Sequence, residues 1–266
     1  MARPVALTIA GSDSSGGAGI QADLKTFAAF GVYGASAITA LTAQNTRGVF
    51  GIHSVPAAFV TAQIDAVFDD LVVRAVKIGM VVELSIIEAI ADALTRWKPE
   101  HVVLDPVMVA SSGDRLLPAA AVESLRNDLI PRASLITPNL PEAAALLDES
   151  VAPDEATIRS QGKRLLALGA RAVLIKGGHG QGIESIDYLF IGDNVTALPA
   201  PRIATANTHG TGCSLSSAIA AGLAKGEALE QAVRGAKTWI SAAIAAADRL
   251  GIGHGHGPIH HFHRFD

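Results

Sequence analysis

Short apolar runs alternate with longer amphipathic segments along most of the chain. The short runs are near-continuous, as in strands buried on both faces of a sheet, while the longer segments repeat their apolar positions every three or four residues, as helices do. We predict strands over Val5–Ala10, Ala35–Leu41, Ala75–Ile78, His101–Leu104, Ser134–Thr137 and Ala172–Lys176. We predict helices over Ala18–Phe30, Ala57–Leu71, Glu83–Trp97, Pro118–Leu129 and Glu155–Leu168.

Strands separated by helical segments favour crossover connections, and hence an α/β fold with a mainly parallel central sheet and helices on both faces, a three-layer α/β/α arrangement. Two more apolar runs, Ile186–Ile191 and Asn194–Leu198, are joined through Gly192-Asp193 and predict a hairpin added at one edge. No linker, repeat or low-complexity segment precedes the C-terminal tail. We therefore predict a single domain over residues 1–266.

Polar residues follow several of the predicted strands directly. In open parallel sheets the ligand binds beyond the carboxyl ends of the strands. These residues should therefore converge on one rim, and the candidates are Gly11-Ser12-Asp13, Gln44-Asn45, Gly79-Met80, Asp105, Asn139 with Glu142, and Lys176-Gly177-Gly178.

The stretch from Asn207 to Lys225 joins a glycine-containing turn to a helical pattern. Gly210 and Gly212 lack the Cβ that would block a close ligand, so Gly210, Thr211 and Gly212 form a helix N-terminus suited to phosphate oxygens. Cys213, the single cysteine, lies where the helix dipole favours a thiolate. The alternative is a turn before a packing helix with an inert cysteine. Convergence of the other polar residues favours the phosphate site.

A second glycine-rich stretch, Gly11 to Ala22, follows the first predicted strand. Its Gly17-x-Gly19-x-x-Ala22 matches the dinucleotide fingerprint and raises a nicotinamide-dependent dehydrogenase as a rival. That fold needs an acidic residue about 20 positions later. The segment Thr39 to Thr46 contains no acid, so we reject the dehydrogenase. The chain also lacks the P-loop pattern G-x-x-x-x-G-K-[ST].

Two residues near this stretch are candidates for substrate contact. Asp23 lies at the edge of a helical apolar face, either as an exposed first-turn acid or as a carboxylate on the rim of a pocket. Gln44 offers a donor and an acceptor side by side, which match the amino group and ring nitrogen of an aminopyrimidine. A solvated loop glutamine is its ordinary alternative.

Acids and lysines at other strand and helix ends suggest a phosphate and metal site. Asp105 ends a strand and Glu142 opens a helix, and together they suit a Mg²⁺ bound near phosphates. Lys176 ends a buried strand. Lys237 interrupts an apolar helical stripe, where it either extends to solvent or reaches a phosphate.

Composition and charge narrow the protein class. The net charge of −4 gives no basic stripe for nucleic acid or a membrane surface. The single cysteine fits a reducing compartment, and no apolar run reaches the roughly 18 residues of a membrane span. We expect a soluble cytoplasmic protein. The histidine-rich tail Gly253–His263 is interrupted by Gly and Pro, so we favour a folded-back closing segment over a metal site.

Seven motifs together resemble the bacterial hydroxymethylpyrimidine/phosphomethylpyrimidine kinases of the ribokinase-like superfamily. They begin at Gly11, Thr39, Lys77, Leu104, Thr137, Ile175 and Thr208, and read GSDSSGGAGIQADLK, TALTAQNT, KIGM, LDPVM, TPNLPE, IKGGH and THGTGC. The resemblance runs from about Val5 to the tail. It implies ATP as phosphate donor, Mg²⁺, and 4-amino-5-hydroxymethyl-2-methylpyrimidine or its monophosphate as acceptor, in thiamine biosynthesis.

The resemblance also implies roles for individual residues. Gln44 would read the pyrimidine, and Gly210, Thr211 and Gly212 would form the anion hole. Cys213 replaces the aspartate base found in most of the superfamily, a departure shared with some pyridoxal kinases, so it would take or only orient the hydroxyl proton. We expect substrate contacts from Gln44, Asp23, Gly11, Met80 and Val107, ATP contacts from Lys176, Lys237, Asn139 and Thr211, and Mg²⁺ near Asp105 and Glu142.

Two other functions remain open from the sequence. A pyridoxal kinase would run the same chemistry on a pyridine. A non-catalytic pyrimidine sensor would keep Gln44 and lose turnover. The family resemblance is compatible with a homodimer.

Overall fold

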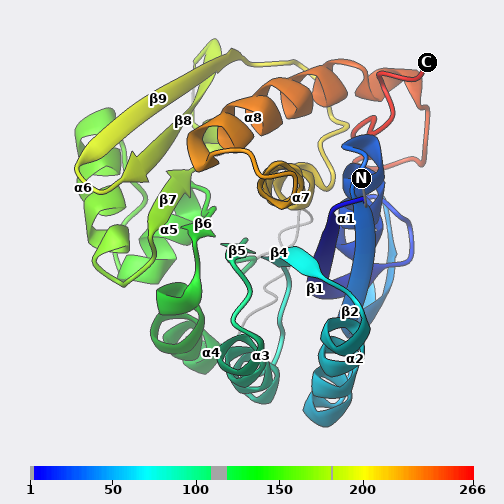
Figure 1. The fold of residues 1–266 in the computed structure, drawn as a ribbon. Coiled ribbons are helices and arrows are strands. Elements are labelled where there is room, and N and C mark those ends of the chain that lie inside the picture. Colours follow the sequence, from blue (N-terminus) through cyan, green and yellow to red (C-terminus); the bar gives the residue numbers. More distant parts are fainter. Residues whose placement is uncertain (1–2, 109–118, 181) are drawn as a thin grey trace.

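The computed structural model describes residues 3–108, 119–180 and 182–266. Within these ranges nine strands form one sheet, in the order β3-β2-β1-β4-β5-β6-β7-β8-β9 (Figure 1). Neighbours from β2 through β7 pair in parallel, while β3, β8 and β9 pair antiparallel at the two edges. The strands are β1 (Val5–Asp13), β2 (Tyr33–Asn45), β3 (Gly48–Ser54), β4 (Val73–Ile78), β5 (His101–Leu104), β6 (Leu135–Ile136), β7 (Ala172–Ile175), β8 (Glu184–Ile191) and β9 (Asn194–Pro201).

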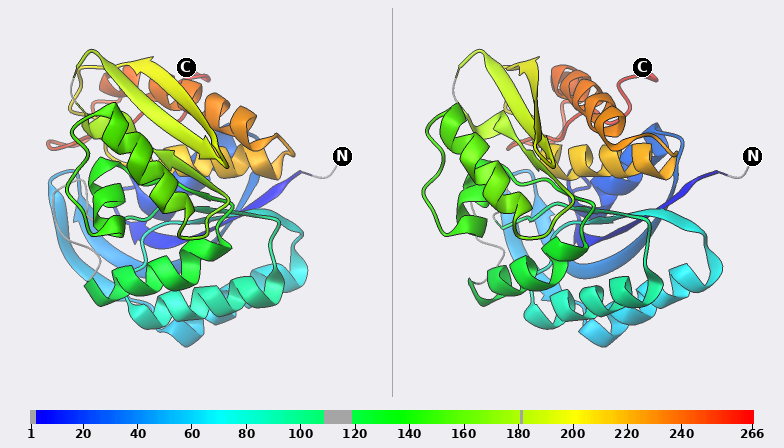
Figure 2. Two further views of the ribbon diagram at one scale, coloured as in Figure 1. Left: turned by 90° about the vertical axis from the view of Figure 1, so that its left-hand side faces the viewer. Right: turned by 60° about the vertical axis from the view of Figure 1, so that its left-hand side comes forward.

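Helices cover both faces of this sheet. One buried cluster joins it to α2 (Ala57–Asp70), α3 (Leu84–Trp97), α4 (Ala119–Ser124), α5 (Leu140–Leu147) and α6 (Glu155–Leu166). A second cluster joins the other face to α1 (Gly19–Ala29), α7 (Thr211–Ala224) and α8 (Leu229–Ala245). Figure 2 shows the strands between α2 and α3 on one side and α7 and α8 on the other.

The strand β1 illustrates how the layers are built. Leu7 and Ile9 belong to the first cluster and Ala6 to the second, because successive side chains of a strand point to opposite faces. The predicted three-layer α/β/α fold is confirmed. In the described part of the chain, no helix is long and apolar enough to cross a membrane.

The predicted elements differ from the observed ones mainly at their ends. β1 and β2 continue past Ala10 and Leu41 to Asp13 and Asn45, which carries their polar ends to the rim of the sheet. The strand β3 was not predicted, because it contains two glycines and exposes Phe50 and Ile52 instead of burying an apolar run. The edge hairpin is confirmed as β8 and β9.

The helix predicted over Pro118–Leu129 is confirmed only in part. Pro118 lies outside the described residues. The described helix α4 ends at Ser124, and the chain continues as a π-helical turn over Leu125–Leu129 and a 3-10 turn over Ile130–Arg132.

The C-terminal tail folds back onto the loops before α7 and after β2. Pro258 forms a parallel bridge with His209, and the amide of His256 donates to the Thr46 carbonyl over 2.8 Å. Ile259 is fully buried. The tail is therefore the closing segment that we predicted. No cluster of three metal-ligating side chains occurs in the described ranges, which include all of this tail.

Candidate active site

A cavity of about 800 Å³ opens at the carboxyl ends of the strands, beside the N-terminus of α7. Its wall includes every residue to which the sequence analysis gave a specific catalytic, binding or metal-ligating role, apart from Asp23. These residues are Gly11, Gln44, Met80, Asp105, Val107, Asn139, Glu142, Lys176, Gly210, Thr211, Gly212, Cys213 and Lys237. The expected convergence of strand-end residues on one rim is confirmed except at Asn45, Gly79 and Gly177, which do not line the cavity.

The loop before α7 contacts the loop after β1 through glycine backbones. Gly210 has a φ of +80°, and a Cβ there would lie 1.9 Å from the Gly17 carbonyl oxygen. The Thr211 hydroxyl donates to the Thr208 carbonyl over 2.7 Å and closes the turn. The first residues of α7, whose amides have no intrahelical partner, thus form part of the cavity wall. This arrangement suits an anionic ligand.

Cys213 stands at this helix N-terminus, but its thiol is not acidic. Burial is the largest effect and raises the pKa of Cys213 to about 11, while the Lys77 ammonium opposes the rise. The predicted thiolate is therefore wrong, because loss of hydration disfavours the charged sulfur more than the Lys77 ammonium favours it. At neutral pH the cavity wall carries a neutral thiol.

Lys176 is a fixed cation beside the loop that precedes α7, residues 207–210. Its Nζ donates to Asp105 Oδ1 over 2.7 Å and lies 3.7 Å from Glu142 Oε2. Although burial opposes both charges, the pair holds the pKa of Asp105 below and that of Lys176 above its ordinary value. A Cβ on Gly212 would lie 3.3 Å from Lys176 Nζ, so the cation reaches the start of α7.

Asn139 and Glu142 begin α5 with a capping box. Asn139 accepts from the Glu142 amide over 2.8 Å, and Glu142 accepts from the Asn139 amide over 2.7 Å. Glu142 is thus a first-turn helix acid and a cavity residue at once. Burial raises the pKa of Glu142 to about 7, although Lys176 opposes the rise.

Asp105 and Glu142 fit a Mg²⁺ that takes most of its ligands from elsewhere. Within the described ranges, no three metal-ligating side chains gather into a complete protein cage. Mg²⁺ in nucleotide sites keeps several waters and binds one or two carboxylates together with phosphate oxygens. Burial disfavours the charged carboxylate of Glu142 and so raises its pKa. A nearby cation would stabilise that carboxylate.

Lys237 lies on the cavity wall with an acidic partner that the sequence did not reveal. Its Nζ lies 2.7 Å from Asp187 Oδ2 and donates to the Ser185 carbonyl over 3.1 Å. Asp187 in turn accepts from the Gly177 amide over 2.8 Å. The hairpin strand β8 therefore holds a helix α8 lysine at the cavity, which explains how a cation interrupts an apolar stripe.

Asp23 was predicted either as an exposed acid or on the pocket rim, and both predictions are wrong. It is fully buried beneath the cavity and accepts from Lys77 Nζ over 2.8 Å. It also accepts from the hydroxyls of Thr8 and Ser217. These partners explain its burial, because an interior charge needs a counter-charge and hydrogen bonds.

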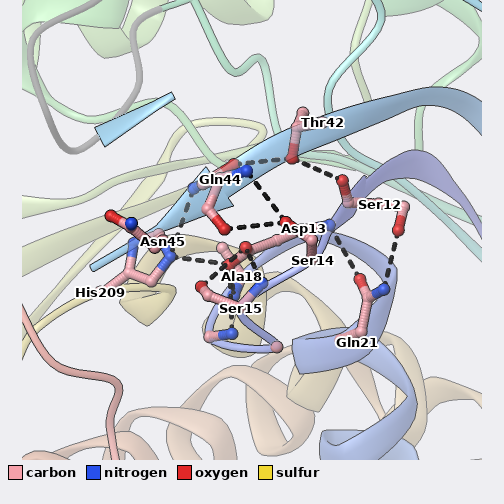
Figure 3. A network of polar contacts seen from close by, with 12 residues as sticks. Ser12, Asp13, Ser14, Ser15, Ala18, Gln21, Thr42, Gln44, Asn45 and His209 are labelled. Carbon is pink, nitrogen blue, oxygen red and sulfur yellow. Dashed lines mark hydrogen bonds and ion pairs between the residues drawn. The ribbon is translucent and has the colours of Figure 1, made fainter. Parts of the chain in front are cut away.

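Gln44 lies on the cavity wall near the end of β2. Its amide lies between Thr42 and His209, with Oε1 3.0 Å from Thr42 Oγ1 and Nε2 3.4 Å from His209 Nε2 (Figure 3). Nearby, a Cβ on Gly11 would lie 2.2 Å from Met80 Cε. Glycine at position 11 thus lets the Met80 side chain lie flat against β1.

Asp13 joins the loop after β1 to His209 in the loop before α7. Its carboxylate accepts from the amides of Ser15, Gly17 and Ala18, and His209 Nε2 lies 2.8 Å from its Oδ2. Burial opposes the charge, but the hydrogen bonds from His209 and the Ser15 side chain hold the pKa of Asp13 well below its ordinary value.

Sequence reasoning gave no role to several residues that complete the site. Lys77 and His209 stood within quoted motifs, and Asp13 was named only as a rim residue. The sequence did contain a signal for these three residues, because an ionisable residue at a strand end or beside a glycine-rich loop is unusual. Asp187 gave none, because its partner Lys237 lies 50 positions away in the sequence.

Comparison with known proteins agrees with this geometry. The family model described as phosphomethylpyrimidine kinase matches residues 13–260. The chain is 59% identical over 261 residues to the hydroxymethylpyrimidine/phosphomethylpyrimidine kinase of Rhizobium meliloti (strain 1021), covering 98% of each chain. It is 55% identical to that of Escherichia coli (strain K12), covering 99% of each chain.

Solved structures show the same fold. The ADP complex of Bacillus subtilis pyridoxal kinase has a TM-score of 0.91 and 36% identity, covering 100% of both chains. Phosphomethylpyrimidine kinase from Clostridium difficile 630 has a TM-score of 0.81 and 45% identity, covering 91% of this chain and 100% of that one. Matching motifs, cavity and relatives over nearly the whole length place the chain in the phosphomethylpyrimidine kinase family.

Proposed function

We propose that this protein is an ATP-dependent kinase of thiamine biosynthesis. It phosphorylates 4-amino-5-hydroxymethyl-2-methylpyrimidine and then the resulting monophosphate. The observation that carries the proposal is that Gln44 and the helix α7 phosphate loop line one cavity. A pyrimidine bound at Gln44 would share that cavity with the phosphoryl group bound at the loop. The relatives at 59% and 55% identity bear the corresponding name.

The reaction is an in-line transfer of the ATP γ-phosphoryl group to the hydroxymethyl oxygen. Phosphoryl transfer passes through a loose transition state, so positioning and charge stabilisation supply most of the rate. The amides at Gly210, Thr211 and Gly212, with the Lys176 ammonium, stabilise the charge on the transferring group. Cys213, as a neutral thiol, orients the substrate hydroxyl.

The remaining cavity residues hold the nucleotide. Lys237, Asn139 and Thr211 bind ATP. When Mg²⁺ is bound, Asp105 and Glu142 hold it near the phosphates, where its charge offsets theirs.

A pyridoxal kinase is the second candidate, favoured by the fold neighbour from Bacillus subtilis at TM-score 0.91. Pyridoxal presents a hydroxymethyl group on a pyridine, so the same phosphate loop would serve. Gln44 favours the pyrimidine kinase over the pyridoxal kinase, because its paired donor and acceptor match an aminopyrimidine edge. A non-catalytic sensor would bind the pyrimidine and consume no ATP.

Parallel assays decide between these functions. Purified protein receives ATP and Mg²⁺ with either hydroxymethylpyrimidine or pyridoxal, and products are followed by mass. We expect the pyrimidine to gain one phosphate and then a second. Turnover of pyridoxal alone would establish the second candidate, and binding without turnover of either compound would establish the sensor.

We also place the enzyme in the cytoplasm. The free Cys213 at the cavity supports this proposal, because a reducing compartment keeps a thiol intact. A homodimer stays a prediction of the family resemblance, which sedimentation would test.

A further inference from the structure

The side-chain amide of Gln44 is held at both ends. One terminal atom lies 3.4 Å from His209 Nε2 and the other lies 3.0 Å from Thr42 Oγ1. The oxygen and nitrogen of an amide have nearly the same shape, so hydrogen-bond partners decide which end is which. Both partners here can be assigned from their own contacts.

His209 Nε2 cannot accept a hydrogen bond from Gln44. Its Nε2 lies 2.8 Å from Asp13 Oδ2, and Asp13 is a carboxylate held charged by backbone amides, so it can only accept. Nε2 therefore carries a hydrogen in either charge state of the ring. That hydrogen is donated to Asp13, and a ring nitrogen that carries a hydrogen has no lone pair left to accept another. An NH₂ group of Gln44 at this point would therefore lack an acceptor, whereas the amide oxygen is attracted to the positive side of the N–H group.

Thr42 must present a lone pair toward Gln44. Its single hydroxyl hydrogen donates to the Ser12 carbonyl oxygen, which lies 2.8 Å away and can only accept. The remaining contact of Thr42 Oγ1, with Gln44, must then be an accepted hydrogen bond. This second, independent contact places the NH₂ group of Gln44 on the Thr42 side.

We propose that His209 and Thr42 are positioning residues that lock the Gln44 amide, with its oxygen toward His209 and its NH₂ group toward Thr42. This inference rests on the proposed substrate class. Gln44 then accepts from the exocyclic amine of the pyrimidine on the His209 side and donates to the adjacent ring nitrogen on the Thr42 side. In a 4-oxo pyrimidine the donor and acceptor are exchanged. Its carbonyl oxygen would face the Gln44 oxygen, and its ring N–H would face the Gln44 NH₂ group.

Contacts with the tail and with Asp13 hold His209 in place. The His209 backbone amide donates to the Gly257 carbonyl over 3.0 Å, and its carbonyl accepts from the Ile259 amide over 3.4 Å. The closing tail therefore fixes the backbone of His209, while Asp13 fixes its ring. An unlocked glutamine would rotate its amide and accept both pyrimidines.

The test compares two matched pairs of variants, His209→Ala with His209→Gln, and Thr42→Val with Thr42→Ser. The Gln and Ser variants keep a donor or hydroxyl in place. For each, kcat/KM is measured with the 4-amino substrate and with its 4-oxo analogue. We expect the wild-type preference for the amino compound to fall about tenfold in His209→Ala and Thr42→Val, the effect of one hydrogen bond, and to persist in the Gln and Ser variants. The KM for ATP should stay constant.

Each outcome decides the inference. An unchanged preference in both His209→Ala and Thr42→Val overturns it, as does equal loss of activity on both compounds, which marks a merely structural role. If His209→Ala does not fold, the Thr42 pair decides. If the wild type phosphorylates neither compound, the proposed function fails, and calorimetric binding of the two compounds to the same variants still tests the lock.

Discussion

Single residues in this site owe their chemistry to burial as much as to their position in the chain. Cys213 lies at a helix N-terminus, yet burial raises its pKa to about 11. Asp23 and Lys77 are fully buried and neutralise each other beneath the cavity. In this cavity, burial keeps the thiol of Cys213 protonated.

Replacing Cys213 tests whether the thiol orients the substrate or removes its proton. We expect Cys213→Ala to slow the first phosphorylation about tenfold, the effect of one lost hydrogen bond. The second should slow much less, because its acceptor is already an anionic phosphate. Cys213→Ser keeps a hydroxyl that orients equally well, so it should retain most of the first activity. Rates for each step come from product masses in single-turnover experiments.

A Cys213→Ser enzyme as slow as Cys213→Ala in the first step would instead identify the thiol as a base. General bases contribute about a hundredfold or more, so the size of the loss separates the two roles as well.

Among the elements, α7 has the strictest requirement at its start. Gly210, the residue that caps the N-terminus of the helix, is in the left-handed region, and the loop after β1 touches its backbone. The contact brings two distant glycine loops together, so that Gln44 and the start of α7 line one cavity. A Cβ at this point would push the two loops apart.

Gly210→Ala should therefore abolish most activity. The new Cβ would lie 1.9 Å from the Gly17 carbonyl oxygen, and displacement of the loop by about 1 Å is enough to lower kcat/KM about a hundredfold. Gly226→Ala is the matched control, because Gly226 has a φ of +87° and open space around its Cβ. It should lose roughly 1 kcal/mol of stability from backbone strain and keep its activity.

Steady-state kinetics and urea unfolding of both variants separate the close contact from the strain. Equal activity in the two variants would show that the contact between the glycine loops does not position the site.

At the scale of the whole molecule, the C-terminal tail closes the structure over α7 and α8. His261 is buried, its Nε2 lies 2.9 Å from Ser214 Oγ in the first turns of α7, and its ring lies 6.3 Å from that of Trp239 on α8. Burial lowers the pKa of His261 from 6.5 to about 4, and the nearby Lys25 acts in the same direction. The tail is thus docked through a neutral histidine.

Stability should accordingly fall as the pH falls through this window. The unfolded chain protonates His261 near 6.5 and the folded chain only near 4, so acid favours unfolding between these values, by up to about 3 kcal/mol. Urea unfolding at pH 7 and pH 5 measures the loss, and His261→Gln should reduce it. His254→Gln, at an exposed tail position, is the control and should behave like the wild type.

An identical pH dependence in the wild type and His261→Gln would assign the acid sensitivity to other groups.

The sequence alone predicted the layers of the fold and the convergence of the site. Apolar runs and helical repeats are local patterns, and the carboxyl ends of parallel strands must meet at one edge. Gln44, Asp105, Lys176 and the loop at Gly210 could therefore be assigned to one site from their positions after predicted strands and before a predicted helix. For these residues, the position relative to predicted strands and helices is enough to predict the position in the sheet.

Only the tertiary structure decided what each ionisable group pairs with. His209 and Asp13 lie 196 positions apart in the sequence, and Lys77 and Asp23 lie 54 apart. The charge state of a group depends on burial and on such distant partners. Neither can be predicted from the periodic pattern of apolar residues. For this reason the thiolate at Cys213 and the rim position of Asp23 were wrong, and the orientation of the Gln44 amide became accessible only through its neighbours in space.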